Sequence, residues 1–138
     1  MTIDDLKAYR YMAAEIEALQ LQIAQLYSPV RSPNLVSIGA RGNTVSDPTH
    51  SSVMLADELQ RQLEEKQEVL RSRAAEIETW LNSVRDDRIR MAIRWHFLLG
   101  ATWKETARKV DPSLSVVGLK KAFFRWFDEQ KESQKDAH

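Results

Sequence analysis

Six cationic side chains near the C-terminal end are the residues of this sequence best suited to binding a ligand. They lie in two short segments separated by a turn, and they are Lys104, Arg108, Lys109, Lys120, Lys121 and Arg125. Lysine and arginine bind phosphates, and both can reach the edge of guanine in the DNA major groove. We expect the first three cations to contact phosphates and the last three to approach bases, with Val117 beside a thymine methyl group.

The net charge of the whole chain hides this concentration of cations. Twenty Lys or Arg and twenty Asp or Glu give a formal net charge of zero. Residues 85–127 nevertheless hold ten Lys or Arg against four Asp or Glu, whereas residues 1–84 hold eight against twelve. This local net charge of +6 predicts a polyanionic partner, and double-stranded DNA is the partner that we favour. The alternative is a three-helix packing module with a basic exterior.

The sequence contains no arrangement typical of an enzyme or a metal site. It has no cysteine, and no spacing groups its three histidines, His50, His96 and His138. Adjacent carboxylates such as Asp86 and Asp87 diverge on a helix. No phosphate-loop lysine motif and no dinucleotide-binding glycine motif is present. We therefore predict no catalytic residue, no metal and no cofactor, and we expect His96 to be a core residue.

Three helical patterns in residues 86–127 must position the cations. Gly100 suits the left-handed position that ends the first helix. Thr102 and Glu105 have the spacing of a capping box, in which the side chain of each accepts from the backbone amide of the other. Residues 111–113 form a turn, and Ser113 or Ser115 caps the last helix. Two helices joined by a turn, the second of them cationic, are typical of proteins that place a helix in the major groove.

Apolar residues fall on one side of each of these three helices. Those expected to face the core are Ile89, Ala92, Ile93, His96 and Phe97, then Thr106, Ala107 and Val110, and finally Leu119, Ala122, Phe123 and Trp126. Arg88, Arg90 and Arg94 then fall largely outside the core, as do the six cations. Phe124 points with the basic face, so we expect it to be exposed, and stacking of single-stranded bases is an alternative to duplex binding.

Residues 4–27 predict a long amphipathic helix. Its apolar side chains recur at alternating spacings of three and four, the pattern of a coiled-coil seam. They are Tyr9, Met12, Ile16, Leu19, Ile23 and Leu26, and Leu6 and Ala13 widen the stripe. Ser28-Pro29 ends the helix, because a residue before proline avoids the α region. Residues 28–46 contain prolines and glycines and are expected to form an irregular connector.

A second long helix is expected to run from Asp47, as the N-cap, with Pro48 in the first helical position, to about Asn82. Its apolar stripe comprises Ala56, Leu59, Leu63, Leu70, Ile77, Trp80 and Val84, and Lys66 and Arg73 interrupt it. Two paired helices make a thin core. We therefore expect residues 1–84 to self-associate, with a homodimer favoured.

The predicted fold class is all-α. A long antiparallel helical hairpin occupies residues 1–84, a helix-turn-helix unit residues 85–130, and a polar, frayed tail residues 131–138. No apolar run approaches the roughly 18 residues that a membrane span needs, and no secretory signal is visible. We expect a cytoplasmic protein that does not contact membranes.

Three short stretches carry a resemblance to a known family: residues 45–49, the arginine-rich helix that ends at Gly100, and residues 102–107. With the order of the parts, they resemble the phage transcriptional regulators of the RinA and ArpU type, in which a helical pair precedes a helix-turn-helix like that of sigma-factor region 4. The resemblance implies control of late phage gene transcription through promoter DNA in a bacterial host cell. RNA polymerase is a further candidate partner. Residues 116–121 depart from the Ser-, Thr- and Arg-rich helix expected of such regulators.

The function predicted is therefore sequence-specific DNA binding by a transcriptional regulator. Two alternatives of different classes stay open. One is a phage DNA-packaging protein such as a small terminase subunit, in which the DNA-binding part usually precedes the helical pair. The other is a helical protein–protein interaction module whose working surface is the hairpin.

Overall fold

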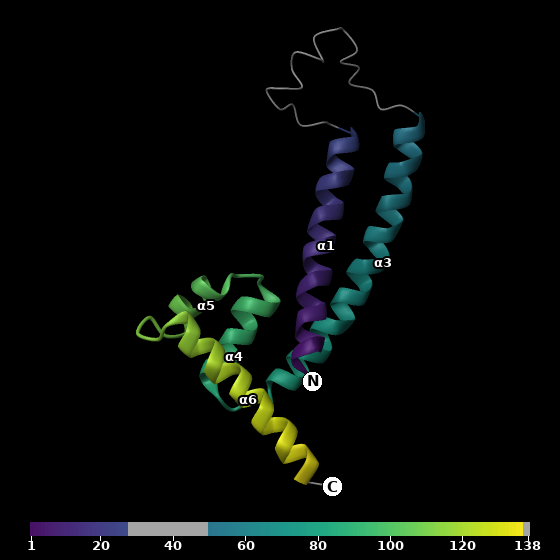
Figure 1. Ribbon diagram of the computed structural model, residues 1–138. Helices are drawn as coiled ribbons and strands as arrows, with labels where there is room; N and C mark the ends of the chain where they lie inside the picture. Colours follow the sequence, from purple (N-terminus) through teal and green to yellow (C-terminus); the bar gives the residue numbers. More distant parts are fainter. Residues whose placement is uncertain (28–49, 137–138) are drawn as a thin grey trace. The chain divides into compact units, whose positions relative to one another are not determined.

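The computed structural model describes residues 1–27 and 50–136, and all regular structure in these residues is helical. The elements are α1 (Ile3–Tyr27), α3 (His50–Leu81), α4 (Asp87–Ala92), the π-helical segment η1 (Ile93–Leu98), α5 (Trp103–Val110) and α6 (Val116–Asp136). α1 and α3 form a long antiparallel pair (Figure 1). The shorter helices α4, α5 and α6 follow them in the chain. The all-α prediction is confirmed. The expected connector, the Asp47-Pro48 helix start and the stretch 45–49 lie outside the described residues.

Contacts between residues group the chain into two compact units. The hairpin unit comprises residues 14–69, and the core unit comprises residues 1–13 and 70–138. The first turns of α1 and the last turns of α3 therefore belong with the C-terminal helices. The change in sequence pattern predicts a domain boundary between residues 84 and 85, and this boundary stays a prediction.

The core unit is built around a buried cluster drawn from every one of its helices. The members are Leu6, Ile77, Leu81, Val84, Ile89, Ala92, Ile93, Phe97, Ala107, Leu119, Phe123 and Phe127. Leu6 and Phe123 are each 0% exposed, so one side chain near the start of α1 is as deeply buried as the centre of α6. The predicted inward faces of α4, η1, α5 and α6 are confirmed, with Val110, Ala122 and Trp126 half-buried and the rest buried.

The hairpin unit has a narrower core. Ile16 and Leu19 of α1 and Ala56, Leu59 and Leu63 of α3 are buried, as their spacing predicts. Lys66 interrupts the α3 stripe without leaving an unpaired charge in it, because its ammonium pairs with Glu15 at 3.2 Å. Its stem covers apolar surface while its head stays at the solvent boundary.

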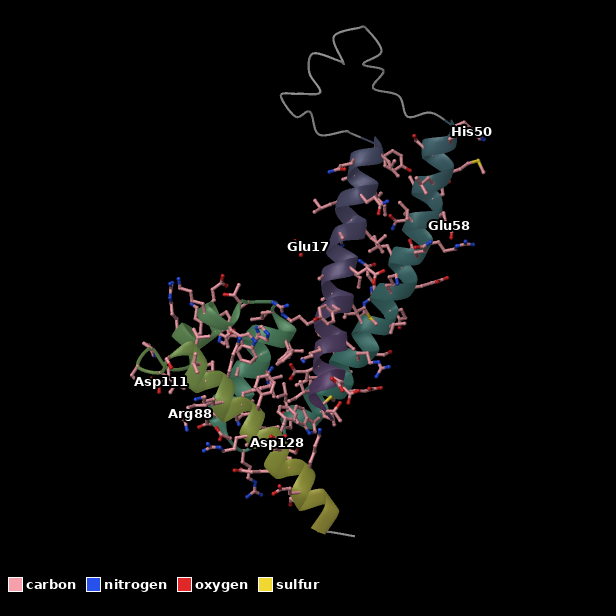
Figure 2. All side chains as sticks on the ribbon, in the orientation of Figure 1. Glu17, His50, Glu58, Arg88, Asp111 and Asp128 are labelled. Carbon is pink, nitrogen blue, oxygen red and sulfur yellow. The ribbon has the colours of Figure 1, made fainter. Side chains whose placement is uncertain are left out.

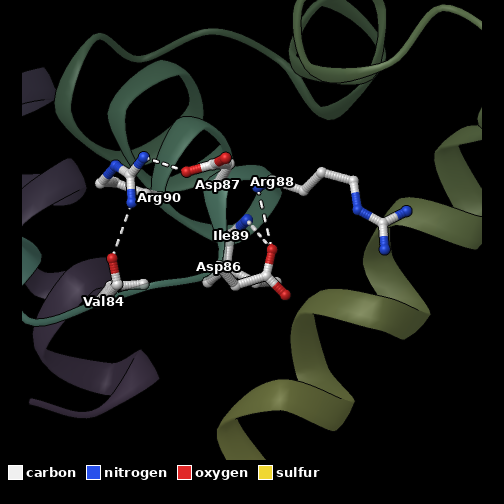
Figure 3. Close-up of polar contacts among 6 residues, drawn as sticks. All are labelled: Val84, Asp86, Asp87, Arg88, Ile89 and Arg90. Atoms are coloured by element: carbon white, nitrogen blue, oxygen red, sulfur yellow. Dashed lines mark hydrogen bonds and ion pairs between the residues drawn. The ribbon is translucent and has the colours of Figure 1, made fainter.

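Polar side chains define where the helices begin. At α1, Thr2 and Asp5 form a full capping box: the Thr2 amide donates to the Asp5 carboxylate at 2.9 Å, and the Asp5 amide donates to the Thr2 hydroxyl at 3.2 Å. At α4, the Asp86 carboxylate accepts from the amides of Arg88 and Ile89 (Figure 3). At α6, Ser115 is the cap, since its hydroxyl accepts from the amide of Gly118 at 2.9 Å.

The last helix is longer than its apolar pattern indicates. α6 continues through Asp136, and it includes most of the segment expected to be a frayed polar tail. Lysines and glutamates are good helix formers, so a solvated extension needs no further apolar contact. None of the described helices is both long and apolar enough to cross a membrane.

Candidate nucleic-acid interface

The entry to α5 combines a helix end, a glycine and a new helix start within a few residues. The amide of Leu99 donates to the carbonyl of Arg94 at 2.9 Å, which is the wide hydrogen-bond spacing of a π-helix. Gly100 follows with φ of +78°, so the predicted left-handed position is confirmed. π-helical turns often occur at functional sites, and no local sequence pattern indicated this one.

Half of the predicted capping box at α5 is present. The Thr102 hydroxyl accepts from the Glu105 amide at 3.1 Å. Glu105 and Thr102 are both described, and the return bond from the Thr102 amide to the Glu105 carboxylate is not formed between them. The Glu105 side chain is exposed and points to water instead. Thr102 is therefore a single N-cap.

The turn between α5 and α6 is held by its own aspartate. The Asp111 carboxylate accepts from the Ser113 hydroxyl at 2.6 Å and from the Ser113 amide at 3.0 Å. These two bonds, with a smaller contribution from the charge of Arg88, hold the pKa of Asp111 below its usual value of 3.8. Ser113 thus stabilises the turn, whereas Ser115 caps the helix.

The predicted base-contacting residues of α6 share one face. Val117, Lys120, Lys121 and Arg125 line a shallow depression of about 450 Å³ together with Phe124 and Asp128. We call this surface the α6 depression. Val117 is 61% exposed, so its methyl groups are available to a ligand. Asp128, labelled in Figure 2, is the one lining residue whose charge opposes a phosphate.

The predicted phosphate-contacting residues of α5 do not all share one edge. Lys104 and Arg108 are one turn apart and lie on the same side of the exposed face. Lys109 follows Arg108 directly, so it lies about 100° further round the helix. Its ammonium sits over the indole of Trp95 in η1, 5.1 Å from the ring centre. Lys120 of α6 lies similarly over the indole of Trp103, at 5.9 Å.

Some arginines elsewhere in the core unit are engaged with acceptors of the protein itself. Arg94 forms two hydrogen bonds with Glu78, at 2.7 and 3.2 Å. Arg90 contacts Asp87 and the carbonyl of Val84 (Figure 3). In the described part of the chain, by contrast, none of the six predicted contact cations on α5 and α6 forms an ion pair with a carboxylate. Their charges are therefore available to an external anion.

Arg88 is a further exposed cation that sequence reasoning placed outside the core without assigning it to the site. Its side chain extends away from the Asp86 carboxylate that caps α4 (Figure 3). Its charge contributes to the lowered pKa of Asp111 in the turn between α5 and α6. The sequence signal was present, since Arg88 is out of phase with Ile89 and Ala92.

Aromatic rings pack beneath two of the predicted contact cations, Lys109 and Lys120. His96 stacks on Trp103 with ring centres 4.0 Å apart, and Phe97 and Phe123 stack at 5.5 Å. His96 is buried, as expected of a core residue. Phe124 is 37% exposed, which agrees with its expected place on the basic face. No group of histidines and carboxylates in the described residues could hold a metal ion.

Comparisons of the chain with protein-family models, with curated proteins and with solved structures find no match.

Proposed function

We propose that this chain is a DNA-binding transcriptional regulator, of the phage type that its sequence resembles. In this proposal α6 enters the major groove of double-stranded DNA and α5 lies along the flanking phosphates. Val117, Lys120, Lys121 and Arg125 read base edges, and Lys104, Arg108 and Lys109 contact phosphates. The hairpin joins two copies of the chain, so that two such helices can meet two half-sites.

The observation that supports this proposal is that the six cations of α5 and α6 form no ion pair with a carboxylate of the described residues. The carboxylates of the core unit neutralise Arg90 and Arg94, but no such pairing involves the six cations of α5 and α6. A cluster of unpaired like charges is unfavourable in the free protein, and a polyanion relieves it by releasing counterions. An exposed valine within the cluster supplies an apolar contact that a purely electrostatic surface would not need.

Residues 116–121 depart from the family's pattern, and their side chains determine which bases α6 would contact. Lys120 and Lys121 can donate to guanine O6 and N7, and Val117 can touch a thymine methyl. The helix has no asparagine or glutamine in this stretch to form the paired bonds that adenine accepts. We therefore propose a preference for sites in which guanine and thymine are presented to α6.

The test is retention of duplex fragments of the source genome at low salt, followed by a salt titration on a retained fragment. Retention that falls steeply with salt supports DNA binding. Lys121→Ala should reduce retention of the preferred fragment, whereas Lys131→Ala, on the same helix but outside the α6 depression, should not. Failure of the wild-type chain to retain any fragment at low salt would refute the proposal.

A further inference from the structure

A second hollow of the core unit lies beside the α6 depression and shares one residue with it. It encloses about 370 Å³, and its lining includes Lys7, Arg10, Tyr11, His96, Trp103 and Phe124. We call it the aromatic hollow. Phe124 lines both surfaces, so they adjoin at this ring. The first turns of α1, predicted only as part of an oligomerisation hairpin, thereby contribute to the surface next to the proposed DNA-binding helix.

The charge of the aromatic hollow favours an anion. Lys7 and Arg10 are its charged lining residues, and no aspartate or glutamate lines it. Arg10 is held in place by its bonds to backbone carbonyls: its Nε donates to the carbonyl of His96 at 3.0 Å, and one terminal nitrogen lies 3.5 Å from the carbonyls of Gly100 and Ala101. Carbonyls do not neutralise the guanidinium, which has five donors in all. Lys7 is exposed and free to reach an incoming phosphate.

The rings of the aromatic hollow divide into a closed floor and two open walls. Trp103 has His96 stacked on its ring and the ammonium of Lys120 5.9 Å from its ring centre, so other side chains of the core unit already contact it. Tyr11 is 68% exposed and Phe124 is 37% exposed. A planar ring entering the hollow would gain contact with both of these side chains.

These features together identify the class of ligand. We propose that the aromatic hollow binds an unpaired nucleotide, with the nucleobase against Tyr11 and Phe124 and the phosphate at Lys7 and Arg10. Aromatic side chains stack on any base, and flanking cations hold the backbone of a single strand in this way. The volume falls in the range of roughly 300–1,000 Å³ typical of small-ligand sites, which fits one nucleotide and not a duplex.

An unpaired nucleotide can come from two sources, a free mononucleotide or a DNA strand whose duplex part lies on α6. The second source rests on the proposed function, and the first does not. The shared residue Phe124 suits a strand that leaves the α6 depression and places one base in the adjoining hollow. Binding of a nucleotide from either source requires Tyr11 and Lys7. The affinity for the hollow rises with the length of the ligand only if a DNA strand is the source.

The experiment uses the full-length chain labelled with ¹⁵N and follows the indole N–H signals of its four tryptophans. The signal of Trp103 is assigned from its loss in Trp103→Phe. Thymidine monophosphate, a ten-residue oligothymidine and a DNA duplex are titrated separately. We expect the mononucleotide and the oligomer to shift the Trp103 signal, while Trp80 and Trp126, which do not line the hollow, stay unchanged.

Variants show whether the hollow itself binds. Tyr11→Ser should weaken binding of the oligomer by about fivefold or more, as expected for loss of one stacked base. Tyr27→Ser is the matched control, because Tyr27 is an exposed tyrosine of α1 outside the hollow. Lys7→Gln should weaken binding and make its salt dependence shallower. Affinity much higher for the oligomer than for the mononucleotide identifies a strand as the source, and equal affinity identifies a free nucleotide.

Two results separate failure of this inference from failure of the proposed function. If neither the mononucleotide nor the oligomer shifts the Trp103 signal, while Lys121→Ala weakens duplex binding, the hollow is not a nucleotide site and α6 still binds DNA. If no DNA binds but the mononucleotide shifts the Trp103 signal and Tyr11→Ser abolishes the shift, the hollow is supported and the regulator proposal fails.

Discussion

Arg10 of α1 donates from Nε to the backbone carbonyl of His96 in η1 at 3.0 Å, which ties the start of the chain to the end of the π-helical segment. The carbonyls in the last turn of a helix have no partner within the helix. Arg10 supplies one from a residue distant in the sequence. The bond joins the first turns of α1 to the C-terminal helices within the core unit.

The first prediction follows from this bond. Arg10→Met should lower the free energy of unfolding by about 1–2 kcal/mol, because it removes a charged donor from half-buried carbonyls while keeping the apolar stem. Urea denaturation followed by circular dichroism measures the change. Lys7→Met is the control, since Lys7 is exposed and forms no hydrogen bond that the structure records. Equal stability of the two variants would mean that water replaces Arg10 at no cost.

Thr102 and Glu105 test whether α5 begins with one cap or two. Thr102→Ala should cost about 1 kcal/mol of stability, because the Glu105 amide loses its acceptor. Thr102→Ser retains a hydroxyl and should cost less. Glu105→Ala should change stability by less than about 0.5 kcal/mol, because the Glu105 carboxylate makes no return bond. A large loss in Glu105→Ala would show that the full capping box forms in solution.

His96 gives the core unit a pH dependence of defined sign. Burial is the largest cause that lowers the pKa of His96 below 6.5; the nearby charges of Arg10 and Lys120 act in the same direction, and the bond with the Ala101 carbonyl opposes them. The unfolded chain therefore binds a proton at a higher pH than the folded chain does. The stability from neutral His96 is fully present above pH 6.5 and is lost as the pH falls below that value.

The measurement is the free energy of unfolding between pH 5 and pH 8 for wild type and His96→Phe. Wild type should lose stability below pH 6.5 with a slope of at most about 1.4 kcal/mol per pH unit, the limit for one proton. His96→Phe should have a flatter profile in this window, whatever its absolute stability. The lowered pKa values of Asp5 and Asp111 act only below their usual value of 3.8, so they do not interfere. Parallel profiles would rule out His96 as the source.

Much of the fold follows from periodicity in the sequence. Apolar residues recur at helical spacing on η1 and α5, and this spacing shows which side chains face the core. Gly100 and Thr102 mark helix ends through their own backbone conformation and side-chain hydrogen bonding. Leu6 was placed with the hairpin seam, yet it is buried in the core unit with Phe123. A single helix pattern shows which face is apolar but not which of two cores that face joins.

The candidate site was only partly predictable for a similar reason. The helix repeat alone separates Lys109 from Arg108, so their different environments could have been anticipated. The capping box of Thr2 and Asp5 also has a recognisable spacing. The contribution of Arg10 and Tyr11 could not be predicted, because it depends on a long-range contact between α1 and η1. The π-helical spacing had no sequence signal either.

Self-association of the hairpin can be tested with a substitution at an exposed position, which leaves the core of the hairpin unit intact. Leu21 is 61% exposed on α1, and the exposed Ala14 and Ala18 precede it at spacings of seven and three. This is the face turned away from the buried Ile16 and Leu19. We expect wild type to sediment as a dimer or larger species at micromolar concentration, and Leu21→Lys to sediment as a folded monomer.

Leu19→Ala is the contrasting variant for this experiment. Leu19 is buried within the hairpin unit, so its truncation should cost about 2–5 kcal/mol of stability whether or not the chain self-associates. A monomeric wild type would end the self-association proposal. A dimer unaffected by Leu21→Lys would place the contact on another face of the hairpin.

The last prediction separates the two proposed kinds of DNA contact. If roughly four phosphates are neutralised per chain, the logarithm of affinity should fall with the logarithm of salt concentration at a slope of about −3.6. Lys109→Ala removes a proposed phosphate contact, so it should weaken all duplexes alike and make the slope shallower by about one unit. Lys121→Ala should instead lose about 1–3 kcal/mol more on the preferred site than on random DNA, because Lys121 is proposed to contact a guanine. Lys131→Ala is the control for a change of one charge on α6. If the Lys109 and Lys121 variants both bind both DNAs like wild type at every salt concentration, α6 is not a recognition helix, and another surface of the chain binds the DNA.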